Sequence, residues 1–395
     1  MRRTWLWGAM AVALAIYVAK LARVLLGLRR LRPGTNGEET IVSVIVPARN
    51  EGTNVGACLD GLDRQSYPRY LMEIIVVDDR SSDGTAEIVR AMRARNPRIR
   101  LVTVDEVPPG IAPKKHAIAT GIASALGDIV VTTDADCTHP PGWIAGLVRM
   151  FEPDVGVVVG HTVYREPRTW FEGLQAIDYL SHRIIGAGTI GAGGVLTGTA
   201  SNLAYRKRVF EEIGGFGDGG AVVSGDDDLF LHRVRARTSW RIAVASSPET
   251  FVTTEPVAGW RAFLGQRARW ASKTTRYNRE TLPFLMATFV LFLLIVLLLP
   301  FAIARPRRWM AFWAMLAVKW GVDYAVMRTG TRTFGQQGLM RYFWIANLLN
   351  PFYVVAATVW GVLGAFSWKG ARFSRTVGHQ GECGDTPHDA EEGSR

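Results

Sequence analysis

The stretch Phe284–Ala304 is a run of 21 residues without a charged side chain. A helix needs about 20 apolar residues to cross the hydrocarbon core of a bilayer. The run therefore predicts a transmembrane helix and argues against an ordinary water-soluble protein. The whole chain of 395 residues is 48% apolar and 21% charged, which is too polar for membrane spans alone. We expect a water-facing domain joined to membrane segments.

The N-terminal segment is a second apolar run. Residues 4–28 are uncharged apart from Lys20 and Arg23, whose long side chains can extend toward lipid headgroups. A cleaved signal peptide is the alternative, because the chain starts with a basic pair. No small-residue cleavage site followed by polar sequence is evident. We predict a membrane anchor over residues 1–30.

The C-terminal third contains two more candidate spans. Residues 309–327 include Lys319 and Asp323, whose i, i+4 spacing places both on one helix face, where they can pair. Whether this segment crosses the membrane completely stays open. A further uncharged run covers 342–367. The resulting predictions are transmembrane segments over 282–368 and a disordered tail over 370–395.

Basic residues outnumber acidic ones by 46 to 35, which gives a net charge of +11. Such an excess suits either nucleic acid or an anionic membrane surface. Basic clusters at 29–32 and 305–308 lie beside apolar runs, so membrane lipids are the predicted partners and nucleic acid is not. The aromatic and basic stretch 260–278 predicts an amphipathic helix at the membrane interface.

Residues 41 to about 255 alternate short β-branched runs with helix-like segments. The runs at 41–46, 73–77, 99–104 and 128–133 predict strands. Such alternation indicates an α/β fold, with a mostly parallel sheet covered by helices on both faces. Ligands of such sheets bind beyond the carboxyl ends of the strands.

Acidic motifs follow two of the predicted strands. Asp78 and Asp79 end the second strand, where carboxylates can accept hydrogen bonds from a nucleobase or ribose. Asp134 and Asp136 follow the fourth, and residues two apart in an extended segment point the same way. Two such carboxylates suit Mg²⁺ or Mn²⁺ shared with substrate phosphates. For each motif alone, a turn or a helix cap is the alternative.

A third acidic motif is the run Asp226, Asp227 and Asp228. Three adjacent carboxylates are tolerated at an exposed loop or helix start, and the functional alternative is that one is a general base. If they begin a helix, consecutive side chains diverge by about 100°. Only one can then reach an acceptor, and the others should cap, coordinate or face water.

The last motif is Gln266-Arg-Ala-Arg269-Trp270. On a helix, Gln266, Arg269 and Trp270 share one face. An arginine there can bind a diphosphate through two nitrogens, and a tryptophan can form the wall of an acceptor site. The alternative is a basic interfacial helix with its tryptophan seated in the membrane.

Taken in this order, the motifs resemble those of the family 2 glycosyltransferases, which have a nucleotide-sugar-binding GT-A fold. The resemblance covers residues 41–281 and implies a GT-A domain there. The matching stretches are VPARNE (46–51), VVDDRSSDGT (76–85), PKKHA with Lys114, DAD (134–136), SGDDD (224–228) and QRARW (266–270), which fits the family's Q-x-x-R-W.

The resemblance also implies a role for each matching residue. The expected nucleotide-sugar-binding residues are Pro47, Asn50, Glu51, Asp78, Asp79, Lys114 and Asp134. The expected ligands of a divalent metal are Asp134 and Asp136. The family usually has T-E-D or E-D where this chain has Ser-Gly-Asp-Asp-Asp, so the register is ambiguous, and the leucines that follow favour Asp226 over Asp227 as general base. Gln266, Arg269 and Trp270 would close over the diphosphate and the acceptor.

The implied reaction is an inverting transfer of one sugar from a nucleotide sugar, expected to be a UDP-sugar, to a lipid hydroxyl. The small number of predicted spans argues against a polysaccharide channel. We therefore expect the transfer of a single sugar, with processive polysaccharide synthesis as the alternative. A non-catalytic nucleotide-sugar-binding membrane protein is the second alternative. Since nucleotide sugars are cytoplasmic, we expect a multi-pass protein of the cell inner membrane with residues 41–281 in the cytoplasm.

Overall fold

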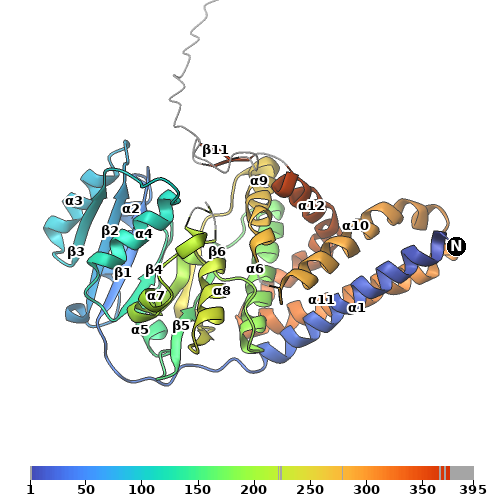
Figure 1. Ribbon diagram of the computed structural model, residues 1–395, viewed down its shortest axis with the longest axis horizontal. Helices are drawn as coiled ribbons and strands as arrows, with labels where there is room; N and C mark the ends of the chain where they lie inside the picture. The colour runs from blue at the N-terminus through green and yellow to red at the C-terminus, as the bar shows by residue number, and fades with distance from the viewer. Residues whose placement is uncertain are drawn as a thin grey trace, which may run out of the picture.

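The computed structural model describes residues 2–363 except 221, 223, 224 and 278, together with 366–368 and 371–373. A sheet with its flanking helices forms one end of the molecule, and long helices form the other (Figure 1). Most of the tail predicted over 370–395 lies outside the described residues. The three that are described, Ala371–Phe373 (β11), pair antiparallel with Phe366–Trp368 (β10).

The main sheet has seven strands within the described residues, in the order β3-β2-β1-β4-β7-β5-β8. The first four strands along the chain are mutually parallel, whereas β7 runs antiparallel to both β4 and β5. A separate parallel pair joins β6 to β9. The strands are β1 (Val42–Ala48), β2 (Met72–Asp79), β3 (Ile99–Val104), β4 (Ile129–Thr132), β5 (Val155–Val159), β6 (His161–Tyr164), β7 (Leu203–Arg206), β8 (Arg241–Val244) and β9 (Phe251–Thr254).

Both faces of the sheet are covered, as predicted. Ile45 and Val77 belong to a core shared with α4, whereas Val44 and Val76 belong to a core shared with α2 and α3. Burial on both faces explains why the central strands read as continuous apolar runs. The helices of this half are α2 (Val55–Asp63), α3 (Thr85–Arg95), α4 (Pro113–Ser124), α5 (Trp143–Val148), α7 (Lys207–Glu212) and α8 (Asp228–Arg237).

In the part of the chain that the structure describes, six long helices make up the other half of the molecule (Figure 1). The helix α6 stands between the sheet and the remaining helices. The helix α1 crosses α6 so closely that a Cβ atom on Gly27 would lie 1.8 Å from the carbonyl oxygen of Gly188. The six helices are α1 (Arg2–Leu28), α6 (Trp170–Gly191), α9 (Gly259–Ser272), α10 (Leu282–Ala304), α11 (Met310–Thr333) and α12 (Phe343–Leu363).

Within the described residues, three helical segments are long and apolar enough to cross a membrane: Trp5–Leu28, Leu282–Ala304 and Gln337–Val362. They include two of the predicted C-terminal spans and leave out α11. The ion pair predicted within α11 is confirmed, with Lys319 Nζ 2.9 Å from Asp323 Oδ2. The helix predicted over 260–278 ends earlier, at Ser272, and a short turn at Thr274–Arg276 follows.

Candidate active site

Lys114 joins two of the predicted acidic motifs at the carboxyl end of the sheet. It lies in the first turn of α4, and its Nζ atom is 2.7 Å from Asp134 Oδ1 and 3.0 Å from Asp226 Oδ2. Burial alone would lower the pKa of Lys114, but the two carboxylates raise it well above its usual value. Asp134 and Asp226 thereby share one ammonium group, although they lie 92 positions apart in the sequence.

Asp136 lies two residues beyond Asp134, on the wall of the same site. Its side chain is open to the cavity but surrounded by protein, and this desolvation together with the charges of Asp134 and Glu51 raises the pKa of Asp136 to about 6. Such crowding of like charges is relieved when a cation binds.

The donor set fits a divalent metal shared with a substrate. Among the described residues, no group of three or more His, Cys, Asp and Glu side chains could hold a metal ion by itself. Asp134 and Asp136 supply two carboxylates, and Mg²⁺ is commonly bound through one or two carboxylates plus substrate phosphates. The pair therefore fits Mg²⁺ or Mn²⁺ on a diphosphate.

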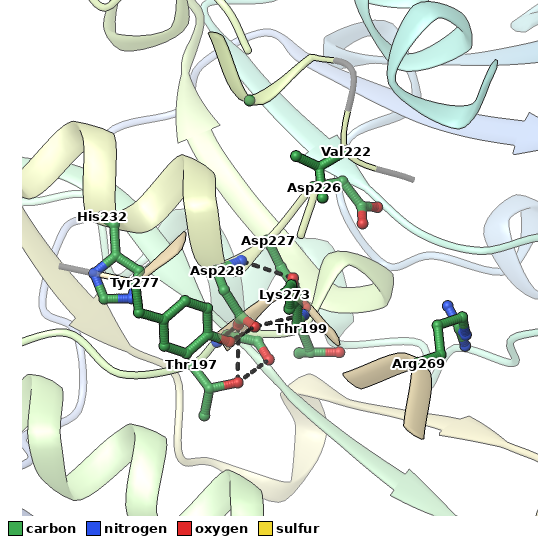
Figure 2. A network of polar contacts seen from close by, with 12 residues as sticks. Thr197, Thr199, Val222, Asp226, Asp227, Asp228, His232, Arg269, Lys273 and Tyr277 are labelled. Atoms are coloured by element: carbon green, nitrogen blue, oxygen red, sulfur yellow. Dashed lines mark hydrogen bonds and ion pairs between the residues drawn. The ribbon is translucent and has the colours of Figure 1, made fainter. Parts of the chain in front are cut away.

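The three adjacent aspartates have different surroundings (Figure 2). Asp226 points away from the other two and pairs with Lys114. Asp227 caps α8 by accepting a 2.7 Å hydrogen bond from the backbone N–H of Asp228, and it lies 3.3 Å from Lys273. Burial would raise the pKa of Asp227, but Lys273 and Arg183 hold it below its usual range.

Asp228 departs from the expectation that the two remaining aspartates cap, coordinate or face water. Its side chain is 1% exposed and is enclosed by hydrogen bonds. Oδ1 accepts from the Thr197 hydroxyl and the Gly198 N–H, each at 2.8 Å, while Oδ2 pairs with Lys273 at 2.5 Å and accepts from the Tyr277 hydroxyl. Asp228 therefore anchors the start of α8 to the helical half.

The predicted nucleoside-binding residues lie at the ends of β1 and β2. Asn50 has a left-handed backbone, with φ of 54°, and its Oδ1 accepts a 2.9 Å hydrogen bond from the Ser82 N–H. The N–H of Glu51 donates to Thr85 at 2.9 Å, so the two loops are fastened together. Pro47 lies within β1, opposite Val77 of β2.

The two aspartates that end β2 differ in their partners. Asp79 accepts a 2.8 Å hydrogen bond from Arg80 and lies 3.8 Å from Arg49. Asp78 is 6% exposed, and its Oδ1 is buried without a hydrogen-bond partner among the described residues. Such an atom is costly unless a ligand or water satisfies it.

The helix α9 presents the Q-x-x-R-W residues to the site and is fixed by a residue between them. Arg267 is 5% exposed and donates from Nε to Asp178 Oδ2 of α6 at 2.8 Å. Tyr353 of α12 also donates to Asp178, and Arg267 donates to the side chain of Gln266. Burial lowers the pKa of Arg269, which faces the charges of Asp226 and Asp134.

A cavity of about 540 Å³ connects these groups with the helical half. The predicted site residues that line it are Lys114, Asp134, Asp136, Asp226, Asp227, Gln266, Arg269 and Trp270. Apolar side chains line it as well, including Leu21 of α1, Phe292 of α10 and Val354 of α12. The predicted residues Pro47, Asn50, Glu51, Asp78 and Asp79 are not among its lining residues.

Sequence reasoning overlooked the residues that hold this site together. Arg267 lies inside the quoted QRARW stretch, yet its partner Asp178 is 89 residues away. Lys273 lies one helical turn after Arg269, which is the one local signal that it belongs to the same site. Asp178, Thr197 and Tyr277 stand in no motif that points to them.

A mostly parallel sheet with carboxylates at its strand ends, beside a helix-lined cavity, is the arrangement expected of the GT-A fold. The family described as Glycosyl transferase family 2 matches residues 43–214, and the one described as Glycosyl transferase family group 2 matches residues 129–322. The chain belongs to the family 2 glycosyltransferases.

Individual relatives agree with this assignment. The chain is 29% identical over 252 residues to the probable glycosyltransferase YdaM of Bacillus subtilis, covering 58% of this chain and 54% of that protein. It is 27% identical over 287 residues to the beta-monoglucosyldiacylglycerol synthase of Synechocystis sp., covering 68% and 56%. The chain thus spans little more than half the length of these curated relatives.

A solved structure extends the similarity over most of the chain. The mannosyltransferase PcManGT from Pyrobaculum calidifontis, in complex with GDP-Man and Mn²⁺, superposes with a TM-score of 0.56 at 25% identity. The match covers 87% of this chain and 99% of that one. The GT-A fold predicted from the sequence is confirmed.

Proposed function

We propose that this protein transfers one sugar from a nucleotide sugar to the hydroxyl of a lipid at the membrane surface, with inversion at the anomeric carbon. The observation that carries the proposal is the shared cavity. Acidic and basic side chains at the strand ends line one part, and apolar side chains of α1, α10 and α12 line another. A lipid acceptor needs both surfaces within reach of the same donor.

The donor diphosphate lies, in this proposal, against Asp134, Asp136, Lys114 and Arg269. Asp134 and Asp136 hold a divalent metal, Mg²⁺ or Mn²⁺, which supplies positive charge to the departing nucleoside diphosphate. Lys114 already lies 2.7 Å from Asp134, so its ammonium group is held at the same place. The PcManGT structure, which is in complex with GDP-Man and Mn²⁺, supports a nucleotide-sugar donor and a divalent metal.

Asp226 is the proposed general base. Its side chain is 12% exposed, lines the cavity, and is not tied to the Asp227–Asp228 network. As the acceptor oxygen forms its bond to the anomeric carbon, the hydroxyl proton passes to the Asp226 carboxylate. The bond to the diphosphate oxygen breaks in the same displacement, and its electron pair leaves with the nucleoside diphosphate. No covalent enzyme intermediate is needed.

The nucleoside is proposed to bind the loops that carry Asn50 and Glu51 and the end of β2. The unpartnered Oδ1 of Asp78 offers an acceptor for an N–H or O–H group there. The donor is expected to be a UDP-sugar, whereas the PcManGT structure holds GDP-Man, so both nucleotides belong in any test.

The proposed location is the cell inner membrane, with several spans and the GT-A domain in the cytoplasm. The three apolar helical segments support this. The Synechocystis relative is named as the synthase of a glycolipid, and this similarity favours a lipid acceptor over polysaccharide synthesis.

The test is transfer by the purified full-length protein in proteoliposomes. A panel of UDP- and GDP-sugars is supplied, and both nucleotide release and glycolipid products are measured by mass spectrometry. We expect a lipid carrying one added sugar and no product with the Asp136→Asn variant. A long polymer would instead show the processive alternative. Nucleotide-sugar binding without any transfer, under every donor and lipid tried, would identify a non-catalytic binder.

A further inference from the structure

A polar cluster joins three helices in the helical half of the molecule. Lys319 and Asp323 of α11 form their ion pair there, Tyr17 of α1 donates a 2.8 Å hydrogen bond to Asp323 Oδ1, and Lys319 donates a 2.6 Å hydrogen bond to Asn347 Oδ1 of α12. Polar groups placed among membrane helices are costly and often serve function. The transfer reaction described above uses none of these four residues.

Two properties indicate that this cluster does more than hold the helices together. Asn347 is 8% exposed, and its Nδ2 atom is buried without a hydrogen-bond partner among the described residues. Asn347, Asp323 and Tyr17 also line the cavity that contains Asp226 and Asp136. A buried amide N–H without a partner is unfavourable unless something in the cavity accepts its hydrogen bond.

The chemistry of the cluster restricts what that partner is. The charges of Lys319 and Asp323 cancel, because Asp323 Oδ2 lies 2.9 Å from Lys319 Nζ as an ion pair, while Oδ1 accepts the hydrogen bond from Tyr17 and Oδ2 accepts none among the described residues. The cluster therefore offers a neutral N–H donor within an apolar wall that includes Phe292 and Phe343. A neutral oxygen acceptor on a lipid fits this donor, whereas a phosphate would enter without a compensating charge.

We propose that Asn347 Nδ2 binds an ester or amide carbonyl of the acceptor lipid and so selects lipids that carry such a carbonyl near the reacting hydroxyl. The inference rests on the proposed lipid acceptor and names its chemical class. Asn347 is a specificity residue for the lipid and takes no part in the proton transfer. The cavity of about 540 Å³ is of the size that holds small ligands.

The experiment measures lipid binding by the full-length protein without any donor. Dioleoylglycerol, which has two ester carbonyls, is compared with its dialkyl ether analogue by native mass spectrometry in detergent. The wild type is expected to bind the ester lipid about three- to tenfold more tightly, the value of one net hydrogen bond. Asn347→Leu is expected to remove this preference.

A second variant guards against misfolding. Asn347→Ala removes the amide donor without adding bulk or charge, so it should fold and also lose the preference. The matched control is Asn350→Leu on the same helix, because the Asn350 amide already donates to Tyr353 at 2.7 Å. The control is expected to retain the preference for the ester lipid.

The outcomes separate this inference from the proposed function. Equal binding of the two lipids by the wild type, or a preference that survives in both Asn347 variants, overturns the inference even if sugar transfer to lipid occurs. A preference that depends on Asn347, together with no sugar transfer to any lipid, supports the lipid site and overturns the proposed reaction.

Discussion

Carboxylates meet opposite conditions in the sheet half and in the helical half of the molecule. At the strand ends, Asp134 and Asp226 share Lys114, and Asp136 stands beside the like charges of Asp134 and Glu51. In the helical half, two buried carboxylates each have a dedicated cation. These pairs are Asp178 with Arg267 and Asp323 with Lys319.

The difference indicates that the carboxylates at the strand ends bind ligands, whereas the paired carboxylates of the helical half stabilise the packing of the helices. Crowded carboxylates at the strand ends cost folding energy that a bound cation and diphosphate can return. Paired carboxylates among the helices are already neutralised, so they hold the helices together, and the Asp178–Arg267 pair fixes the position of α9. Substitutions in the first group should change activity more than stability, and substitutions in the second should do the reverse.

The largest effect is expected for Asp136→Asn. Removing this carboxylate eliminates a proposed metal ligand and relieves like-charge crowding, so transfer should fall by about 10³-fold or more while the unfolding temperature does not decrease. Steady-state transfer and thermal unfolding of the purified variant check both parts. Excess EDTA should abolish sugar transfer by the wild type in the same way. Full activity in EDTA with no metal left bound would contradict the metal assignment.

Asp226→Asn should act on the chemical step far more than on donor binding, because Lys114 keeps its pairing with Asp134. Loss of a general base lowers the rate by about 10²–10⁴-fold. Donor affinity should change little, because the base touches the acceptor. Single-turnover transfer and donor binding are measured for Asp226→Asn and, as the comparison, for Asp227→Asn. A normal transfer rate in Asp226→Asn together with no transfer in Asp227→Asn would identify Asp227 as the general base.

The sheet half was largely predictable from the sequence, and particular strands show why. The run Ile99–Val104 was predicted to the residue because this edge strand, rich in β-branched residues, is bounded by Asn96-Pro97 on one side and by Asp105-Glu106 on the other. The acidic residues at the end of β2 and just beyond β4 follow from the same local pattern. The Lys319–Asp323 pair was equally visible, because i, i+4 spacing alone brings the two side chains together.

The ion pairs and hydrogen bonds that hold the site in place could not be predicted in this way. The Asp178–Arg267 pair joins residues 89 positions apart, and Tyr353 reaches Asp178 across 175 positions. No local periodicity records which helices will pack together. Asp228 illustrates the same limit, since a third aspartate in a row suggests a solvated helix start, whereas tertiary contacts bury it.

Arg267→Met tests the helical side of the comparison. It leaves the buried Asp178 carboxylate without its cation, and breaking such a pair costs about 3–5 kcal/mol. We expect a clear fall in unfolding temperature with donor affinity retained. The double variant Asp178→Leu/Arg267→Met removes both charges and should recover much of the stability. If Arg267→Met alone is as stable as the wild type, this pair does not support α9.

The smallest effect concerns His161, which joins the two halves. This residue of β6 is 2% exposed, and its ring stacks on Phe334 at the end of α11, with ring centres 4.2 Å apart. Burial, reinforced by the charge of Arg183, lowers the pKa of His161 to about 3 from an unfolded value near 6.5. The folded state therefore binds fewer protons than the unfolded chain between these two values.

Because the folded pKa is the lower one, the contribution of neutral His161 is complete above pH 6.5 and is lost as the pH falls toward 3. At pH 5 the loss amounts to about 2 kcal/mol. The variant His161→Phe keeps an aromatic ring against Phe334 and cannot take up a proton, so its unfolding temperature should fall less than that of the wild type between pH 7 and pH 5. His116→Gln is the control, since its side chain is partly open to solvent. Equal acid sensitivity of wild type and His161→Phe would mean that the contact between the two halves is not the acid-sensitive element.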